Sequence, residues 1–391
     1  MSARTRILLF TGKGGVGKTT CAAATALCAA ERGARTLVLS ADPAHSLADA
    51  LDRPLGPEPV EVLPGMFAQE IDLYYSMKKY WANLRELLLT VFRWQGVNQL
   101  AAEELAALPG MAEGSALLWL EQTVRSAEYD LVVVDSAPTG ETLTLLTLPQ
   151  VTEWWVTRAF PFQRTAIRTA GFALRKTTGI PLDRAYEELY ALFERLKRIH
   201  GVLVDPEVSS VRLVVNPERM VIDEARRAYA YLQLYGYAVD AVIVNRVLPE
   251  EGVGRALEGY VRAQAHYLEE IEGSFQPLPM LRVGHGGQEV FGLDALRRVG
   301  DELYADRDPR AVLFRGETYK LAAVDGSYRL DLHLPFADGA QVTARKFGDE
   351  VVIQLRNQRR SFALPHFLAY YTLADSHLVE GWLRLRFEPA S

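Results

Sequence analysis

The stretch Thr11–Thr20 reads TGKGGVGKTT and lies between two regular patterns. Arg6–Phe10 before it is a short apolar run typical of a buried strand, and an alanine-rich helical pattern follows it. The sequence fits G-x-x-x-x-G-K-[ST], whose glycines let backbone N–H groups turn toward phosphate oxygens, while the following helix adds the positive potential of its N-terminus. The stretch therefore predicts a phosphate-binding loop between a strand and a helix.

The chemistry of such a loop predicts a role for each of its residues. Lys18 should bind the β- and γ-phosphates of a nucleotide, and Thr19 should be a ligand of Mg²⁺. We expect the nucleotide to be ATP and to contact the whole loop, which comprises Gly12, Lys13, Gly14, Gly15, Val16, Gly17, Lys18, Thr19 and Thr20.

A second lysine, Lys13, stands near the beginning of the loop. Its side chain is badly placed to reach phosphates that its own loop binds. It could instead cross a dimer interface and place positive charge on the nucleotide of a partner subunit, as an arginine finger does. The spacing alone leaves open the alternative that Lys13 is a solvated surface lysine.

Two aspartates follow predicted strands and face the phosphate site. Asp42, in SADPAHSLADAL, either orients a water molecule for in-line attack on the terminal phosphate or caps a helix or turn. Asp135, in LVVVDSAPTGETL, either positions Mg²⁺ through a water molecule or caps a turn at the end of its strand. Pro138 and Gly140 suit a loop whose conformation changes with the nucleotide state.

Five short apolar runs predict the buried strands of one parallel sheet: Arg6–Phe10, Thr36–Ser40, Leu131–Asp135, Arg212–Val215 and Ala241–Asn245. Helical patterns lie between them, which is typical of a parallel sheet covered by helices on both faces. Ligands of such sheets bind at the carboxyl ends of the strands. The sequence therefore predicts the α/β fold class, as a parallel-sheet P-loop nucleoside triphosphatase.

Two further regions extend this plan. The stretches 74–128 and 150–208 have helical patterns and are too long for ordinary crossovers, so we expect an inserted helical subdomain. From about residue 317 the pattern alternates with period two, as in YRLDLHLP and WLRLRF, and predicts a small all-β sandwich. We expect an ATPase domain over residues 1–312 and a sandwich over residues 317–391 that packs on its own ATPase domain or on a partner subunit.

The composition argues against several classes of protein. The 391 residues carry a net charge of −6, and sequence-independent nucleic-acid binding needs a basic surface, so we expect no nucleic-acid partner. The chain has no run of about 18 apolar residues, so we expect no stable membrane insertion. Cys21 and Cys28 are too few for a metal cage or a disulfide framework, and we expect a protein of the reducing cytoplasm.

Together these motifs resemble a known family. GKGGVGKTT resembles the deviant Walker A motif, and DPAHSL with DSAPTGETL resembles the switches of the branch that contains the arsenite-pump ATPase and the targeting ATPases of tail-anchored membrane proteins. The resemblance extends from about Arg4 to Asp306. The tail, with YRLDLHLPF and GDEVVIQLRNQRRSFALP, resembles the α-crystallin domain of small heat-shock proteins, which one branch of the family carries after the ATPase.

The resemblance implies roles that the spacing leaves open. It implies that Lys13 contacts the nucleotide of the opposing subunit in a homodimer and that Asp42 activates water, so the expected catalytic residues are Asp42, Lys13 and Lys18. Glu218 in VVNPERM and Asn245 in VIVNRVLP match the family's adenosine contacts. A side-chain amide can read the adenine edge with a paired donor and acceptor.

The chain also departs from the family pattern. Ser136 and Glu141 replace the threonine and the histidine of switch II. The Cys-x-x-Cys pair that binds zinc at the dimer interface of the eukaryotic members should follow Asn245 by about a dozen residues, and no cysteine occurs there, so we expect no zinc. The arsenite pump needs cysteines for the metalloid and two ATPase halves in one chain, so arsenite transport is disfavoured.

From these residues we expect a dimeric Mg²⁺-dependent ATPase that couples hydrolysis to a conformational switch and handles a protein client in the manner of the targeting ATPases. The aromatic residues Trp154, Trp155, Phe160 and Phe162 either line a client-binding surface or pack the core of the helical subdomain. Two alternatives remain open: a partition or septum-positioning ATPase, and a chaperone-like holdase with regulatory nucleotide binding.

Overall fold

One large sheet organises the first three quarters of the chain. The computed structural model describes residues 5–42, 46–94, 111–136, 139, 146, 182–250, 254–255, 257–316, 319–333, 342–355 and 358–389. The strand order of the sheet is β3-β4-β2-β5-β1-β6-β7-β8, and only the pair β3–β4 is antiparallel. Its strands are β1 (Arg6–Thr11), β2 (Thr36–Ser40), β3 (Val60–Leu63), β4 (Met66–Glu70), β5 (Leu131–Asp135), β6 (Ser209–Val215), β7 (Val239–Val247) and β8 (Met280–Gly284).

The central strands are buried on both faces. Every residue of β1, β2, β5 and β6 is buried, which explains why these strands read as continuous apolar runs. The helix α1 (Lys18–Glu31) leads from β1 toward one edge of the sheet, and α10 (Arg219–Leu234) leads from β6 toward the other. Because parallel crossovers are right-handed, α1 and α10 lie on opposite faces. The former packs on α2 (Ser46–Leu51) and α12 (Gly292–Tyr304), and the latter on α11 (Glu258–Phe275).

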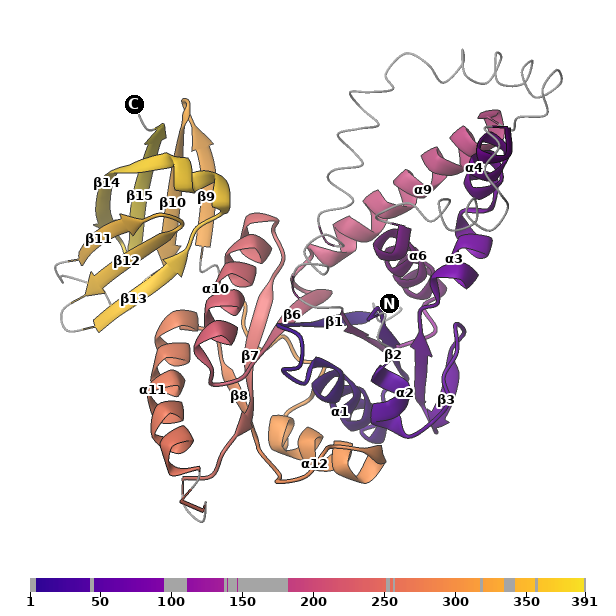
Figure 1. The fold of residues 1–391 in the computed structure, drawn as a ribbon, viewed down its shortest axis with the longest axis horizontal. Helices are drawn as coiled ribbons and strands as arrows, with labels where there is room; N and C mark the ends of the chain where they lie inside the picture. Colours follow the sequence, from indigo (N-terminus) through magenta and orange to yellow (C-terminus); the bar gives the residue numbers. More distant parts are fainter. Residues whose placement is uncertain are drawn as a thin grey trace.

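A helical subdomain extends from one end of the sheet (Figure 1). Its helices are α3 (Leu73–Tyr80), α4 (Ala82–Trp94), α6 (Met111–Ser126) and α9 (Leu182–Leu203), with α6 between α3 and α9. Buried tryptophans join them, since Trp119 Nε1 donates to Ser76 Oγ at 2.9 Å and Trp81 Nε1 donates to Ser115 Oγ at 3.0 Å. Both predicted helical stretches therefore contain helices. The residues of 150–208 that precede Leu182, including the four aromatic residues named above, lie outside the described ranges.

The C-terminal part is the predicted sandwich. Its larger sheet has the order β14-β15-β10-β9 and its smaller sheet the order β11-β12-β13. The inward-facing Leu330, Ile353 and Leu385 belong to a core of its own, separate from that of the large sheet. The strands are β9 (Tyr319–Val324), β10 (Ser327–His333), β11 (Val342–Phe347), β12 (Glu350–Leu355), β13 (Gln358–Ala363), β14 (Tyr371–Val379) and β15 (Trp382–Pro389), with a 3₁₀ turn, η1, over His366–Tyr370.

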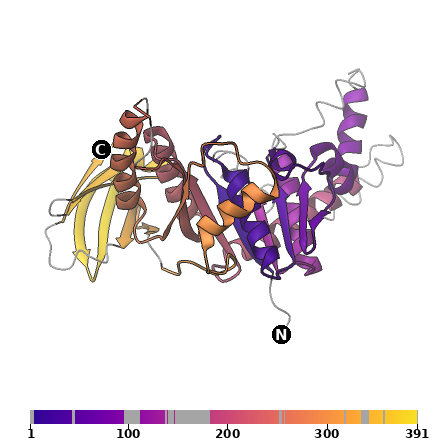
Figure 2. The same ribbon diagram turned by 90° about the horizontal axis from the view of Figure 1, so that it is seen from below.

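The sandwich packs on its own ATPase domain. It lies beside α10 and α11, at the end of the molecule opposite the helical subdomain (Figures 1 and 2). The backbone N–H of His366 donates to the hydroxyl of Tyr231 on α10 at 3.0 Å. In the segment that joins α12 to β9, which we call the connector, Arg315 forms an ion pair with Glu207 at 3.0 Å.

A buried charged network fixes the start of this connector to the sheet. Arg212 on β6 and Asp240 on β7 are fully buried, and their side chains approach to 3.1 Å. Arg212 also donates to the backbone oxygen of Ala311 at 3.1 Å, and Arg6 on β1 donates to that of Arg310 at 3.1 Å. The chain that leaves α12 therefore follows a defined path toward the sandwich.

The predicted fold class is confirmed: a mostly parallel sheet with helices is followed by a small antiparallel domain. All five predicted strands are present, whereas β3, β4 and β8 were not predicted. The domain boundaries at 1–312 and 317–391 stay a prediction. Among the described residues, no helix is long and apolar enough to cross a membrane.

Candidate nucleotide-binding site

Four of the six residues between β1 and α1 are glycines, so most of the backbone of this loop carries no side chain. Gly15 and Gly17 have φ angles of +81° and +94°, in the left-handed region that glycine adopts without strain. A Cβ at Gly12 would lie 2.2 Å from the backbone oxygen of Val214, and one at Gly17 would lie 2.2 Å from Asn245 Nδ2. At Gly14 and Gly15 no neighbouring atom lies within 4 Å of such a Cβ, so the outer side of the loop is open.

The two lysines of the loop occupy different environments. Lys18 is the first residue of α1 and is buried, and its Nζ donates to the backbone oxygen of Lys13 at 3.4 Å. The ammonium group thus bends back over the loop, where phosphates would lie. Lys13 is half-buried, and no side-chain hydrogen bond or ion pair joins it to another described residue. Thr20, two residues beyond Lys18, is half-buried in the first turn of α1.

Oxygen ligands gather beside Lys18. Thr19 Oγ1 and Ser46 Oγ, at the starts of α1 and α2, are 3.0 Å apart. Asp135 ends β5 and is fully buried; its Oδ2 accepts from Ser40 Oγ at 3.3 Å, and its Oδ1 has no partner in the described structure. Two hydroxyls and a carboxylate with an unused oxygen form a donor set that suits Mg²⁺, which takes oxygen ligands and keeps several waters.

Burial is the main influence on the charge of Asp135. The pKa of Asp135 is raised to about 7, mainly by burial; the nearby carboxylate of Asp42 also raises it, whereas the Thr19 hydroxyl and the charge of Lys18 lower it. An uncompensated carboxylate is therefore unfavourable here. A bound divalent cation would remove that penalty, which is a second reason why the residues fit Mg²⁺.

Asp42 lies just beyond β2 on the same edge of the sheet. Its backbone N–H donates to Ser40 Oγ at 3.3 Å, so Ser40 contacts both aspartates of the site. In switch II, Ser136 Oγ donates to the backbone oxygen of Phe10 at 2.7 Å and holds the start of the switch against β1. Pro138, Gly140 and Glu141 lie outside the described residues.

The two residues matched to adenosine contacts lie at the ends of β6 and β7. Glu218 is exposed immediately before α10, and its side chain makes no capping bond to that helix. Asn245 is buried, and its Nδ2 donates to the backbone oxygen of Val16 at 2.8 Å, so in this structure it supports the phosphate loop. Its side-chain oxygen is the group left to read a base.

Three polar residues of the site had no predicted role. Ser40 and Ser46 belong to the quoted SADPAHS motif, and the strand-end rule applied to Asp42 could have identified both. Asn216 follows β6 and is buried, with an Oδ1 that has no partner among the described residues. It precedes the Pro-Glu of VVNPERM, so its position after a strand was the available signal.

This arrangement defines the class of protein. A phosphate loop after β1, two aspartates at the carboxyl ends of neighbouring parallel strands and a helix that begins at the loop lysine are the features of a P-loop ATPase. The sequence comparisons agree: residues 5–305 match the anion-transporting ATPase family, and residues 325–387 match the HSP20-like domain found in ArsA. The chain belongs to the anion-transporting ATPase family and is an ATP hydrolase with an α-crystallin-like C-terminal domain.

Relatives with the same extent are found in several organisms. A protein of Aquifex aeolicus that carries the provisional name arsenical pump-driving ATPase 1 is 35% identical over 375 residues, which cover 93% of this chain and 95% of the relative. Protein Rv2184c of Mycobacterium tuberculosis is 32% identical over 422 residues, covering 99% and 97% of the two chains. The ATPase ASNA1 homolog 1 of Paramecium tetraurelia is 26% identical over 295 residues, covering 73% of this chain and 88% of the relative.

Proposed function

We propose that this site hydrolyses ATP with Mg²⁺ and that the chain works as a homodimer on a protein client. The observation that supports hydrolysis best is the gathering of Lys18, Thr19, Ser46 and Asp135 at one edge of the sheet. The backbone N–H groups of the open loop and the ammonium of Lys18 would bind the β- and γ-phosphates. Thr19 would hold Mg²⁺ directly and Asp135 through water.

Asp42 is the proposed water-positioning group. Its backbone N–H bonds to Ser40, which also contacts Asp135, so Asp42 lies beside the proposed Mg²⁺ site. Its carboxylate is close enough to raise the pKa of Asp135. When bound, Mg²⁺ neutralises charge that develops on the phosphate oxygens. Asp42 would then accept a hydrogen bond from water aligned with the terminal phosphate, while Lys18 stabilises the transferred group.

The hydrolysis proposal is tested with two variants and a control. Lys18→Ala should remove most nucleotide affinity, because it removes the buried ammonium that bends back over the loop. Asp42→Asn should bind ATP normally and lose turnover by about 10²–10⁴-fold, the usual contribution of a general base. Asp49→Asn, an exposed carboxylate on α2, should hydrolyse ATP normally. An Asp42→Asn protein with the wild-type rate would show that another group positions the water.

Exposed apolar residues on the nucleotide edge support the dimer. Met220 and Tyr260 are 71% and 69% exposed and lie in the first turns of α10 and α11; Leu257 and Phe291, which precede α11 and α12, are also exposed. All four follow the carboxyl ends of strands, as Lys13 does. A second copy applied to this edge would cover them and bring Lys13 toward its nucleotide.

The dimer proposal is tested by sedimentation in the presence of ATP. The double variant Met220→Ser and Tyr260→Ser should shift the protein toward monomer, because it removes two of the apolar groups that the partner would cover. Tyr370→Ser, which changes an equally exposed aromatic residue on the sandwich, should leave the association unchanged. Equal association of all three proteins would place the interface elsewhere.

The client is proposed to be an apolar protein segment handled in the cytoplasm. Support comes from the family and from the long amphipathic helices of the helical subdomain, since such helices can form a groove for an apolar helix. The apolar stripe of α9 (Leu192, Leu196, Ile199 and Leu203) is buried against the other helices of the subdomain in this structure, so the proposal requires these helices to separate when the client binds. A fluorescent peptide with one membrane-anchor segment should stay in solution with Asp42→Asn protein and ATP. The peptide should aggregate with Lys18→Ala protein. If both proteins keep the peptide in solution, client binding does not depend on bound nucleotide.

A further inference from the structure

One buried side-chain oxygen at the carboxyl end of β6 has no hydrogen-bond donor. Asn216 directly follows β6 and is 5% exposed, and its Oδ1 has no partner among the described residues. Its backbone oxygen is engaged, since it accepts from the backbone N–H of Glu218 at 2.7 Å. A shielded acceptor without a donor is unfavourable, and the cost disappears when a donor binds it. The place of Asn216 in the sheet indicates which ligand could supply that donor.

Asn216 lies on the face of the sheet that α1 covers. Arg212, four residues earlier, donates to the hydroxyl of Tyr304 on α12 at 2.8 Å, and that hydroxyl lies 2.7 Å from Thr25 Oγ1 of α1. Side chains along a strand alternate between the two faces of a sheet, so a residue four positions after Arg212 lies on the same face. Asn216 is therefore on the side of the sheet where α1 begins at the phosphate loop.

Asn245 lies directly beside Asn216. The register pairs Val215 with Val244, so the residues that follow these two are neighbours at the carboxyl ends of β6 and β7, which are about 4.8 Å apart as adjacent strands. Asn245 Nδ2 donates to the backbone oxygen of Val16 at 2.8 Å, which leaves the Oδ1 of Asn245 as an acceptor. Two side-chain amides therefore lie side by side next to the phosphate loop, each with an oxygen that accepts no bond from a described residue.

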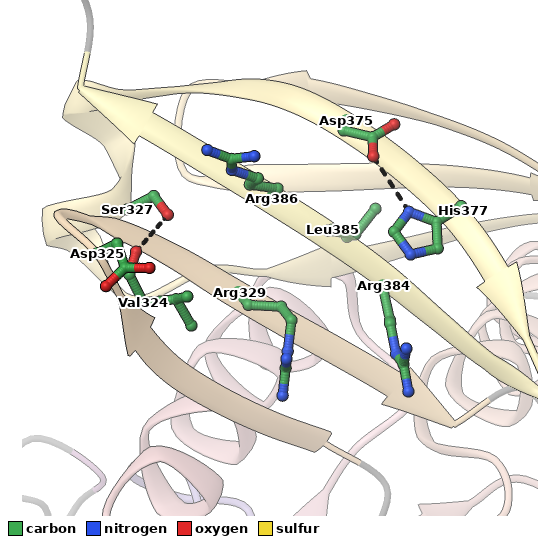
Figure 3. Close-up of a pocket in the computed structure, with 9 residues that line it drawn as sticks. All are labelled: Val324, Asp325, Ser327, Arg329, Asp375, His377, Arg384, Leu385 and Arg386. Atoms are coloured by element: carbon green, nitrogen blue, oxygen red, sulfur yellow. Dashed lines mark hydrogen bonds and ion pairs between the residues drawn. The ribbon is translucent and has the colours of Figure 1, made fainter.

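Other buried polar groups without a partner have a different setting. The hydroxyl of Thr11 on β1 also lacks one, but Thr11 pairs with Leu213 in the register and so lies on the other face of the sheet. In the sandwich, the hollow of about 270 Å³ in Figure 3 contains Arg384, whose Nε lacks an acceptor. Asp331, directly opposite Arg384, has an oxygen without a donor, so the two groups are complementary and the hollow requires no ligand. Asn216 lies beside a second acceptor instead of a donor.

We infer that Asn216 selects adenine by accepting a hydrogen bond from the 6-amino group of the base, while the second N–H of that group is directed to Asn245. The inference rests on the ATP site proposed above. The phosphates of a nucleotide offer acceptors, whereas the 6-amino group of adenine offers two N–H donors. Guanine and hypoxanthine have an oxygen acceptor in that position, which the two acceptors of the protein would repel. The site should therefore prefer a 6-aminopurine nucleotide to a 6-oxopurine nucleotide.

The test is calorimetric titration of the full chain with ATP and with ITP, which differ only around the 6 position of the base. A chelator replaces Mg²⁺, so that neither nucleotide is hydrolysed. The wild type should bind ATP at least about tenfold more tightly than ITP. Asn216→Ala should weaken ATP binding about tenfold and leave ITP binding unchanged, because only ATP loses a hydrogen bond. Asn83→Ala, which removes a half-buried amide on α4, should change neither affinity.

An ATP affinity that Asn216→Ala leaves unchanged would overturn the inference, and so would equal losses for both nucleotides, which would mean that Asn216 only shapes the loop. A preference for ATP over 2′-deoxy-ATP that Asn216→Ala removes would overturn it as well, since a ribose hydroxyl would then be the donor. If Asn216→Ala fails to fold, Asn216→Leu keeps the volume and has the same expectation. A wild type that binds neither nucleotide would overturn the proposed ATP site itself, whereas equal binding of ATP and ITP overturns only the role of Asn216.

Discussion

Asn245 Nδ2 donates a hydrogen bond to the backbone oxygen of Val16 over 2.8 Å, and so joins the end of β7 to the phosphate loop. The same Nδ2 would lie 2.2 Å from a Cβ added to Gly17. The amide of Asn245 therefore occupies the space that a side chain at position 17 would need. This contact holds the loop open for phosphates before any nucleotide binds.

Gly17→Ala should lose most nucleotide affinity, because a methyl group would collide with Asn245 at a position whose φ is +94°. Gly15→Ala is the matched control, since its φ of +81° imposes similar strain of about 1–2 kcal/mol but its surroundings are open. Calorimetric titration with ATP should show a clearly larger loss for Gly17→Ala. Adding Asn245→Ala should recover part of it, and equal losses in both single variants would mean that strain alone acts.

The stability of the empty protein should depend on pH through Asp135. Burial raises the pKa of its carboxyl from the ordinary 3.8 to about 7, so the folded state holds a proton that the unfolded state has lost. The free energy of unfolding should therefore decrease as pH rises from about 4 to about 7. Asp135→Asn removes this term, so its advantage in melting temperature over the wild type should grow across that range.

The measurement is thermal unfolding with a chelator and without nucleotide. Mg²⁺ and nucleotide should then protect the wild type more at pH above 7 than below, because the ionised carboxylate is the form that positions the metal. A melting difference between the two proteins that stays constant with pH would show that Asp135 is already ionised in the empty site.

Mixed dimers test whether Lys13 acts across the interface. In a dimer of one Lys13→Ala and one Asp42→Asn subunit, a trans lysine leaves the first subunit's site intact, because the second subunit supplies Lys13. Random mixing should then restore about a quarter of the wild-type activity, since half the dimers are mixed and one of their two sites works. If Lys13 acts on its own nucleotide, every site is defective and mixing restores nothing.

The thiols should be inert in the folded protein. Burial raises the pKa of Cys21 to about 12 and also raises that of Cys28, and thiolate is the reactive form. A Cβ at Gly300 of α12 would lie 3.2 Å from Cys28 Cβ, so that helix packs closely over the second thiol. Ellman's reagent should detect no thiol in the folded chain and both in denaturant.

This expectation bears on arsenic, which binds thiolates. Several relatives carry names that refer to an arsenical pump, but the two cysteines here are shielded and protonated. Arsenite should leave the ATPase rate unchanged. A stimulation that Cys28→Ser abolishes would reveal a thiol site that opens in another state of the protein.

How much could be predicted from the sequence depended on how each strand is buried. β1, β2 and β5 are buried throughout and were recognised as apolar runs. The edge strands were missed because half of their residues face solvent: β8 alternates between buried Leu281 and exposed Arg282. In β4 the buried Gln69 and Glu70 concealed the strand, since Gln69 Nε2 donates to the backbone oxygen of Pro57 and Glu70 accepts from the backbone N–H of Ala48 only in the folded chain.

The site shows the same limit. Glycines and strand-end aspartates have a local signature, so the loop, Asp42 and Asp135 could be selected from their neighbours in sequence. The contact from Asn245 to Val16 joins residues 229 positions apart, and no local pattern records it. Arg212 was assigned to a strand without a role, because its partner Asp240 is met only when β6 and β7 pair.

That buried pair provides the last prediction. Asp240 accepts from Arg212 Nε at 3.1 Å, lies 3.5 Å from Arg6 Nη2 and accepts from the backbone N–H of Leu313 at 3.3 Å. Asp240→Ala would leave two arginines buried without a carboxylate, so the free energy of unfolding should decrease by about 3–5 kcal/mol. Asp308→Ala, which breaks the exposed pair with Arg310 on the same connector, should cost about 1 kcal/mol or less. Urea unfolding of both variants makes the comparison. Losses of equal size would mean that water reaches the Arg212–Asp240 pair, and that the connector is not fixed to the sheet through it.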